Sequence, residues 1–353
     1  MQKQLIKGNE AVIYGALLGG CTHFFGYPIT PASEIAHSAA ELFPKTGRFF
    51  LQAESEVSVI HMMYGAAGAG ARTMTASSGP GVSLMAEGIS YMAGAELPSV
   101  IVDVQRAGPG LGNIWPEQSD YTMVVKGGAH GNYKNIVYAP NSAQEMCDFT
   151  YRAFDVADRY RMTVFILTDA YIGQMMEPVS FPQEINHGPH KDWAVYGDGP
   201  TRNNLITSIH MNRKLMNDHN VHLQTKYKQV AKEICDWEEY RVQDAEILYV
   251  AYGISSRLAH SAVDELRDQG HKVGLLRPKT LFPFPSPRIA ELSTSMKLIA
   301  VPELSNGQMT QDVLLAVNGR CPVEPLLWMG GTVPGVDEVV QATTDLLKVQ
   351  VAV

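Results

Sequence analysis

Residues 8–180 alternate between short apolar segments and longer segments with helical periodicity, and glycine or proline separates one from the next. This alternation constrains the fold more than any other feature, because strands separated by helices pair in parallel within one sheet. The segment 98–104, PSVIVDV, is apolar and largely β-branched, as is typical of a strand covered on both faces. Expected strands are 22–25, 48–52, 72–76, 98–104, 136–139 and 163–168, and expected helices are 8–20, 31–42, 56–69, 82–93 and 143–160. The sequence therefore predicts an α/β domain with a doubly wound, mostly parallel sheet.

A polar stretch with several prolines interrupts this alternation after residue 180, and helical periodicity returns near 223–240. A second α/β pattern follows, with expected strands at 245–251, 272–276 and 298–301 and expected helices at 255–269, 287–296 and 308–318. We therefore predict a first domain over 1–180, a connector over 181–240 and a second, smaller α/β domain over 241–353.

Charge and hydropathy exclude several kinds of partner. The formal net charge is −8, and the densest basic stretch, 226–232, is typical of a solvated helix face, whereas nucleic-acid binding needs a clustered cationic surface. No window holds the roughly 18 consecutive apolar residues of a membrane-spanning helix, and the N-terminal segment lacks a clean signal-peptide cleavage site. We expect a soluble, cytoplasmic protein that binds neither nucleic acid nor membrane.

The four cysteines, Cys21, Cys147, Cys235 and Cys321, stand far apart, without a CxxC pair. Iron–sulfur clusters and structural zinc sites need several thiolates at short spacings. We therefore expect no cluster and no metal site on this chain, and reduced cysteines that serve as small apolar residues.

Three segments with glycine or proline fall where an expected strand passes into a helix or loop: 26–34 (GYPITPASE), 52–56 (QAESE) and 104–113 (VQRAGPGLGN). Each one alone is compatible with an ordinary tight turn. Each also carries a hydroxyl, a carboxylate or a guanidinium, and sites in parallel sheets lie beyond the carboxyl ends of the strands. The three together favour a site at that edge.

These segments resemble a known family. GYPITPASE, then QAESEVSVIHMMYGAAGAGARTMTASSGPGVSLM (52–85) and PSVIVDVQRAGPGLGN (98–113) are similar to the pyrimidine-binding, α-type subunit of 2-oxoacid:ferredoxin oxidoreductases, which use thiamine diphosphate. PKTLFPFP (278–285) and VPELSNGQM (301–309) resemble the second domain of that subunit, which is similar to the C-terminal domain of transketolase. The resemblance covers nearly the whole chain.

The resemblance implies roles for individual residues. Glu56, and not Glu54, matches the glutamate that shares a proton with the cofactor's aminopyrimidine. The alternative is that both acids merely complement the N-terminus of a helix. Tyr27, Pro28, Ile29 and Ser78 fall in the segments that would contact the cofactor; the SSGPG turn (77–81) is expected to pack against the pyrimidine and not to bind phosphate.

Thr30 and Arg106 match the hydroxyl and the guanidinium that face the carboxylate of the 2-oxo acid. Two alternatives stay open at this point: Thr30 is a helix cap, and Arg106 forms a structural ion pair, with Asp103 or Asp120 as partner. A GDG segment at 197–199, followed at once by Asn203 and Asn204, resembles a Mg²⁺–diphosphate motif, but its spacing is too short, and we interpret it as a turn.

The implied reaction is CoA-dependent oxidative decarboxylation of a 2-oxo acid to acyl-CoA and CO₂, with electrons passed to ferredoxin. Because this chain lacks a diphosphate side and cluster ligands, the resemblance implies a β-type subunit that supplies Mg²⁺ and a 4Fe-4S cluster. A γ-type and a ferredoxin-like subunit are further expected partners.

GPGLGN and KGGAHGNY (126–133) favour a branched-chain substrate, 2-oxoisovalerate; 2-oxoglutarate is the alternative, with Lys126 or His130 as the extra cation it would need. Two other hypotheses remain. One is a stand-alone transketolase-like enzyme and the other a non-catalytic scaffold subunit.

Overall fold

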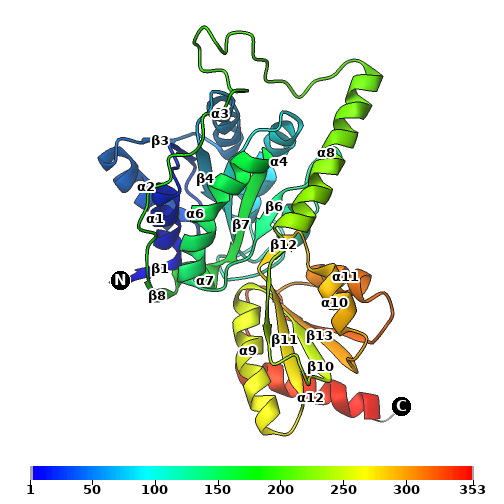
Figure 1. Cartoon of the computed structure of the whole chain (residues 1–353). Helices are drawn as coiled ribbons and strands as arrows, with labels where there is room; N and C mark the ends of the chain where they lie inside the picture. The colour runs from blue at the N-terminus through cyan, green and yellow to red at the C-terminus, as the bar shows by residue number, and fades with distance from the viewer. Residues whose placement is uncertain (1–2, 352–353) are drawn as a thin grey trace.

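The computed structural model describes residues 3–351, with side chains up to residue 348. Its larger domain is built on a seven-stranded sheet in the order β12-β6-β7-β5-β4-β2-β3 (Figure 1). Neighbouring strands are parallel except β12, which runs antiparallel to β6. The strands are β2 (His23–Gly26), β3 (Phe49–Gln52), β4 (Thr73–Ser77), β5 (Ser99–Gln105), β6 (Ile136–Tyr138), β7 (Thr163–Asp169) and β12 (Thr280–Phe282).

Helices cover both faces of this sheet, which confirms the predicted doubly wound arrangement. On one face α1, α2 and α6 pack against one another, and on the other α3 packs against α4. The strands β4, β5 and β7 are buried along their whole length, and most of their residues are apolar or carry small hydroxyls. The helices are α1 (Gly8–Leu18), α2 (Ser33–Lys45), α3 (Glu56–Gly68), α4 (Gly79–Gly94), α5 (Tyr121–Val125), α6 (Ala143–Tyr160) and α7 (Ala170–Gln174).

The smaller domain holds a five-stranded sheet in the order β14-β13-β10-β11-β9, parallel except for β9. The strands are β9 (Trp237–Tyr240), β10 (Ile247–Val250), β11 (Val273–Pro278), β13 (Leu298–Glu303) and β14 (Val323–Leu327). The helices are α9 (Gly253–Asp268), α10 (Ser286–Leu292), α11 (Gln308–Val317) and α12 (Val336–Val351). This domain lies below the first in Figure 1, and its strands carry a second apolar core.

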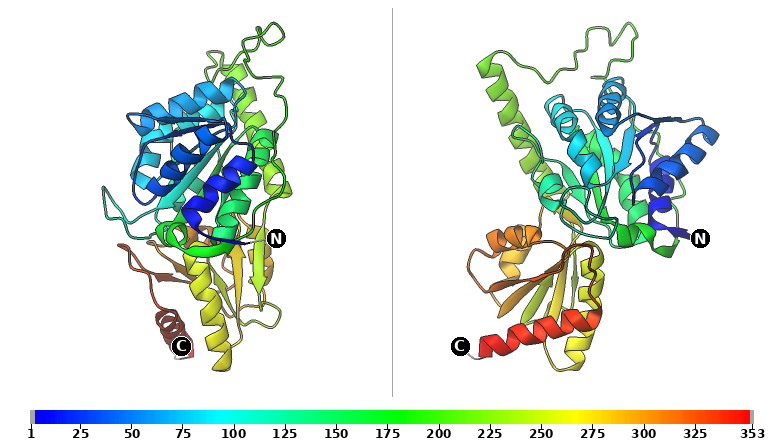
Figure 2. Two further views of the ribbon diagram at one scale, coloured as in Figure 1. Left: turned by 90° about the vertical axis from the view of Figure 1, so that its left-hand side faces the viewer. Right: turned by 180° about the vertical axis from the view of Figure 1, so that it is seen from behind.

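The region between the two domains differs from the expectation. After the two-stranded sheet of β1 (Gln4–Lys7) and β8 (Met176–Val179), the chain runs along the outside of the first domain to its far end and returns as α8 (Arg213–Glu233) (Figures 1 and 2). The helix expected at 223–240 thus begins and ends earlier, because Trp237–Tyr240 forms an edge strand of the second sheet. The segment 278–285 also reaches the first domain, since β12 pairs with β6 of the first sheet.

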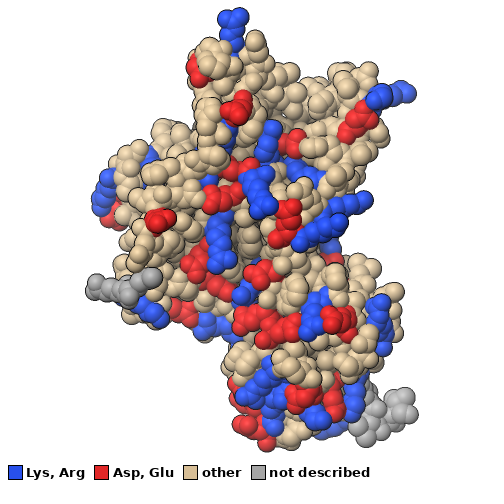
Figure 3. Space-filling view, in the orientation of Figure 1, with Lys and Arg blue, Asp and Glu red and all other residues tan. Residues whose placement is uncertain are grey.

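On the face shown in Figure 3, Lys and Arg side chains alternate with Asp and Glu, including at the narrowing between the two domains. In residues 3–351, no helix combines the length and the apolarity needed to cross a bilayer.

Gln118 joins the two domains and is fully buried. Its Nε2 donates to Tyr252 O (2.9 Å), and its Oε1 accepts from Ser255 Oγ (2.8 Å) and Leu304 N (3.0 Å). The backbone N–H of Gln118 also donates to Leu304 O (2.6 Å). Every polar atom of this side chain is therefore satisfied by the second domain, which holds that domain against the carboxyl edge of the first sheet.

We expect Gln118→Ala to lower the free energy of unfolding by about 3–5 kcal/mol, because three buried polar groups lose their partner. Urea denaturation of the full chain measures the change. Gln341→Ala, at an exposed position where the side chain contacts only Asp345, is the matched control and should change stability by no more than about 0.5 kcal/mol. Equal decreases in the free energy of unfolding of the two variants would contradict the role of Gln118 in holding the two domains together.

Candidate functional site

Four neighbouring strands, β3, β2, β4 and β5, bring the predicted site residues to one edge of the sheet. Each strand ends in a junction that carries some of them: β2 leads to 27–30, β3 to Glu56, β4 to Ser78 and β5 to Arg106. Because the strands are parallel and adjacent, their carboxyl ends lie side by side. The structure thus gathers segments that are up to 80 positions apart in the chain.

Glu56 is the first residue of α3, and its side chain is 6% exposed. Ser55 caps this helix by accepting from Ser58 N (3.3 Å), and the exposed Glu54 carboxylate accepts from the Ser58 hydroxyl. Glu56 takes no hydrogen bond from any side chain or amide in the described part of the chain. The two acids therefore differ: Glu54 is tied to the helix start, whereas the Glu56 carboxylate points into the interior and is unengaged.

The start of α4 makes room for that carboxylate. A Cβ at Gly81 would lie 2.5 Å from Glu56 Oε1 and would also collide with the Ser77 hydroxyl. Only glycine avoids both contacts, so the backbone of α4 approaches Glu56 directly. The Ser77 and Ser78 hydroxyls are buried, and neither has a hydrogen-bond partner among the described residues. Ser78 stands at the N-cap position of α4, yet its side chain caps nothing.

The loop after β2 presents Tyr27, Pro28 and Thr30 to solvent, and Tyr27 is 37% exposed. Ile29 is half-buried and packs against the core. Helix α2 begins later than expected, at Ser33, and its N-cap position is occupied by Ala32. The helix-cap alternative for Thr30 is therefore wrong, and its hydroxyl makes no hydrogen bond within residues 3–351.

Arg106 follows β5 directly. Its Nη1 donates to Thr30 O (2.8 Å), its Nη2 donates to Leu111 O (3.1 Å), and its buried Nε has no partner. No carboxylate of residues 3–351 lies within ion-pair distance of this guanidinium, so the ion-pair alternative is wrong for this chain. The Arg106 guanidinium bonds only to carbonyl oxygens and forms no direct ion pair among these residues, so its N–H groups can also donate to an anion.

Two pockets flank these residues. One, of about 580 Å³, lies between the two domains; Gly79, Arg106 and Asp120 line it from the first domain, and Asn306 and Gly330 from the second. The other, of about 610 Å³, adjoins Thr30 and is mostly apolar. Its walls include Ile114, Trp115, Tyr171, Met175 and Val333. Arg106 is the single cation among the described residues that line these two pockets.

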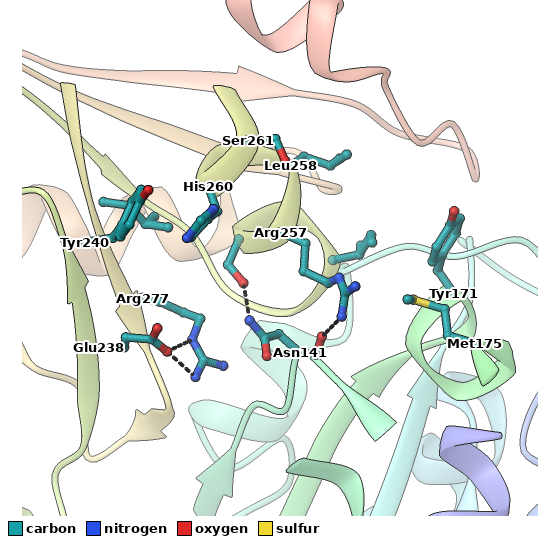
Figure 4. A pocket seen from close by; sticks show the side chains of 13 residues that line it. Asn141, Tyr171, Met175, Glu238, Tyr240, Arg257, Leu258, His260, Ser261 and Arg277 are labelled. Atoms are coloured by element: carbon teal, nitrogen blue, oxygen red, sulfur yellow. Dashed lines mark hydrogen bonds and ion pairs between the residues drawn. The ribbon is translucent and has the colours of Figure 1, made fainter. Parts of the chain in front are cut away.

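A third pocket, of about 460 Å³, contains none of the predicted site residues, although it shares Tyr171 and Met175 with the pocket at Thr30 (Figure 4). Arg277 is held there by Glu145 and Glu238, at 2.6 and 2.8 Å. Arg257 pairs with Glu177 at 2.8 Å. Both arginines are already paired with acids. We therefore interpret this pocket as part of the interface between the two domains and not as an anion-binding site.

The sequence analysis named Asp120 only as a possible ion-pair partner of Arg106 and did not consider Glu117. Burial and the nearby charge of Glu117 raise the pKa of Asp120 to about 7, with a smaller opposing effect from Arg106. Glu117 is buried and accepts from Gly108 N (2.9 Å) and Gly330 N (2.6 Å), so it ties the loop after β5 to the second domain. No local pattern could have identified Glu117, because one of its partners, Gly330, belongs to the second domain.

Two acids order loops by accepting hydrogen bonds. Glu303 caps α11 by accepting from Met309 N (2.9 Å) and Thr310 N (3.0 Å). The GDG segment forms a turn, as predicted: Asp198 Oδ1 accepts from Thr201 N (2.9 Å) and Thr201 Oγ1 (2.6 Å). Throughout residues 3–351, no three His, Cys, Asp or Glu side chains converge as metal ligands.

Comparisons with known proteins match both domains. Residues 14–241 match the family described as pyruvate flavodoxin/ferredoxin oxidoreductase, thiamine diphosphate-binding. Residues 245–339 match the family described as pyruvate:ferredoxin oxidoreductase core domain II.

Two individual relatives support the same family assignment. The chain is 58% identical over 332 residues to the ketoisovalerate oxidoreductase subunit VorB of Methanothermobacter marburgensis, with 94% of each chain covered. It is 39% identical to the 2-oxoglutarate synthase subunit KorA of Archaeoglobus fulgidus, over 89% of this chain and 91% of that one.

Among solved structures, the 2-oxoglutarate:ferredoxin oxidoreductase of Magnetococcus marinus, with 2-oxoglutarate, coenzyme A and succinyl-CoA bound, matches 98% of this chain with a TM-score of 0.87 and 27% identity. This chain spans 65% of the length of that one. A split-gene transketolase, 14% identical with a TM-score of 0.61, shares the fold. With both domains matched in order and a relative identical at more than half of the aligned positions, the chain belongs to the thiamine diphosphate-binding pyruvate flavodoxin/ferredoxin oxidoreductase family, as an α-type subunit of 2-oxoacid:ferredoxin oxidoreductases.

Proposed function

We propose that this subunit takes part in the CoA-dependent oxidative decarboxylation of a branched-chain 2-oxo acid, with 2-oxoisovalerate as the preferred substrate and ferredoxin as electron acceptor. A single observation carries the substrate assignment. The pockets beside Thr30 and Arg106 offer one cation in this chain, and the pocket at Thr30 is walled by apolar side chains. One carboxylate and one apolar side chain fit such a site.

The residues at the edge of the sheet fit the pyrimidine half of thiamine diphosphate. Glu56 offers a buried, unengaged carboxylate, and the Ser77 and Ser78 hydroxyls are buried without partners. Buried polar atoms of this kind call for a polar ligand. Tyr27, Pro28 and Ile29 would border the ring from the loop after β2.

When bound, the cofactor supplies a nucleophilic carbon that adds to the carbonyl group of the 2-oxo acid. In this proposal Glu56 shares a proton with the far edge of the aminopyrimidine, and Gly81 allows the carboxylate to reach it. Arg106 and Thr30 receive the substrate carboxylate, the first with a guanidinium that no acid neutralises.

In this proposal, partner subunits supply the binding groups and cofactors that this chain lacks. A β-type subunit would hold Mg²⁺, the diphosphate and a 4Fe-4S cluster, and γ-type and ferredoxin-like subunits would complete the complex in the cytoplasm. CoA, bound in the Magnetococcus marinus relative, would accept the acyl group.

The 2-oxoglutarate alternative needs a second cation for the distal carboxylate. Lys126 forms an ion pair with Asp312, and His130 lines a separate pocket beside α8. Neither side chain lines the pockets at Arg106, which favours the branched-chain substrate.

The test is reconstitution with a cysteine-rich partner, followed by measurement of kcat/KM for several 2-oxo acids. We expect 2-oxoisovalerate to be preferred over 2-oxoglutarate by at least about tenfold. Equal use of both acids would contradict the substrate assignment. Full turnover by the isolated chain would support the stand-alone alternative.

A further inference from the structure

The loop that follows β14 in the second domain, residues 328–335, reaches the apolar pocket beside Thr30. Gly331 and Val333 line this pocket from the second domain, and Ile114 and Trp115 line it from the loop after β5. Neither domain alone supplies all the walls of the pocket. Its shape therefore depends on how the two loops meet.

Hydrogen bonds fix the place where the two loops meet. Gly330 N donates to Glu117 Oε1 (2.6 Å), and Gly330 O accepts from Asn113 Nδ2 (3.1 Å). Asn113 and Glu117 stand two positions before and two positions after Trp115. Asn113 Oδ1 also accepts from Trp115 N (2.9 Å), and Trp115 O accepts from Ala107 N (2.9 Å). The backbone of Trp115 is thus held in the first loop, and the second domain binds the residues on both sides of it.

Gly331 lies directly against Trp115. A Cβ at Gly331 would lie 2.4 Å from Trp115 Cβ and 3.3 Å from Trp115 Cγ, and the first of these distances is far inside van der Waals contact. Gly331 also has a φ of +90°, which residues with a side chain rarely adopt. Glycine therefore lets the backbone of the second domain touch the base of the tryptophan side chain, and the position of Trp115 depends on residue 331.

The two large side chains on the first-domain wall are largely uncovered in this chain. Trp115 is 63% exposed, and Ile114 is 54% exposed. Large apolar side chains that are exposed together in a concave surface mark a place where an apolar group binds. Arg106 adjoins the same pocket, because its Nη1 donates to Thr30 O (2.8 Å). The pocket thus combines an apolar wall with a neighbouring cation.

We propose that Trp115 and Val333 set the size of the 2-oxo acid side chain that the enzyme accepts, and that Gly331 controls this size by fixing the position of Trp115. The carboxylate of the substrate then meets Arg106, and its alkyl group lies between Trp115 of the first domain and Val333 of the second. Trp115 and Val333 touch the substrate, whereas Gly331 is a positioning residue. The inference rests on the proposed function, because it takes an apolar 2-oxo acid as the substrate.

The physical reason is the space between the two walls. An apolar pocket distinguishes substrates that differ by one methylene by about 10- to 200-fold, because the extra group either fills a gap or collides with a wall. A smaller side chain in one wall leaves a gap beside an isopropyl group and makes room for a larger group. Changes in the walls should therefore alter the preference among 2-oxo acids and not only the rate.

The first test compares two substrates on the reconstituted complex: 2-oxoisovalerate, which carries an isopropyl group, and phenylpyruvate, which carries a benzyl group. In Trp115→Ala we expect the ratio of the two kcat/KM values, phenylpyruvate over 2-oxoisovalerate, to rise at least about tenfold above that of the wild type. Val333→Ala should change the ratio in the same direction, by about threefold, because it removes fewer atoms from the wall.

Trp237→Ala is the matched control for the first test. This tryptophan is also exposed, but it lies on β9 and does not line the pocket at Thr30. Its loss should leave the ratio within about twofold of the wild type. A ratio in Trp115→Ala that stays within the same range would overturn the inference.

The second test addresses the role of Gly331. Gly331→Ala should change the ratio at least about threefold, because the new methyl group must displace the tryptophan side chain. Gly319→Ala is the matched control, since Gly319 also has a positive φ, +75°, but a Cβ there would meet no atom within 4 Å. This control carries similar backbone strain without the contact, and its ratio should equal that of the wild type.

A double variant shows whether Gly331 acts through Trp115. In the Trp115→Ala background, Gly331→Ala should leave the ratio unchanged, because two substitutions that act through one side chain are not additive. An equal change in the ratio with and without the tryptophan side chain would overturn the role of Gly331.

The outcomes separate this inference from the proposed function. Suppose that the wild-type complex prefers 2-oxoisovalerate and that Trp115→Ala lowers kcat/KM by the same factor for both substrates. The proposed function would then stand, and the inference would be overturned. A wild-type complex that prefers 2-oxoglutarate would refute the proposed function itself, and this inference with it.

Discussion

Replacing Glu56 by Gln in the reconstituted complex should lower kcat by about 10²- to 10⁴-fold, the range typical of a lost general acid or base. The amide keeps the shape of the side chain but cannot share a proton with the pyrimidine. The glutamine side chain should fit in the place of glutamate, because Gly81 of α4 has no side chain that would collide with residue 56. Turnover of 2-oxoisovalerate with excess ferredoxin measures the effect.

Glu54→Gln is the matched control, since Glu54 is exposed and contacts only Ser58. It should leave kcat within about twofold of the wild type, because exposed contacts of this kind contribute little. An unchanged kcat in Glu56→Gln would leave the scaffold hypothesis standing, and an equal loss in both variants would point to damage at the start of α3.

Replacing Arg106 by Lys should raise the KM for the 2-oxo acid by roughly 10- to 150-fold, the loss expected for a hydrogen-bonded charge pair. Lysine keeps the positive charge but has no planar fork of donors. In Arg106 the two Nη atoms donate to Thr30 O and Leu111 O. Lysine cannot make both of these hydrogen bonds in the same geometry, so the loop after β5 would also lose a hydrogen bond that orders it. Initial rates over a range of 2-oxoisovalerate concentrations separate KM from kcat.

Arg213→Lys, at the exposed start of α8, is the control and should leave KM unchanged. An unchanged KM in Arg106→Lys would remove the proposed contact with the substrate carboxylate. A loss confined to kcat would instead assign Arg106 to the chemical step.

The first domain was predictable because its signals are local. A strand covered on both faces is mostly apolar, and the central run of β5, Val100–Val102, shows this in its sequence as it does in its burial. Parallel strands then place all their carboxyl ends at one edge, so Glu56, Thr30 and Arg106 could be assigned to one site before their contacts were known. Their roles came from a resemblance, and the geometry supports those roles without testing them.

Two of the strands at the sheet edges, β12 and β9, were not predicted. Thr280–Phe282 follows β11 in the chain, yet it pairs with β6, where an edge of the first sheet would otherwise expose unpaired backbone groups. Trp237–Tyr240 continues a helical pattern in the sequence but becomes a strand for the same reason, at the edge of the second sheet. The edge that a short strand joins depends on unpaired backbone groups of a strand that is distant in the sequence, and local sequence patterns carry no information about that strand.

By itself, the sequence determined the order of strands and helices, the two α/β domains, and the residue types at each junction, because burial and periodicity act on neighbours in the chain. Only the tertiary structure decided which polar groups meet. It placed Glu56 beside Gly81 and buried Gln118 between the two domains. These contacts join segments from different strands and domains, and their energies depend on distances and burial that exist only once the chain is folded.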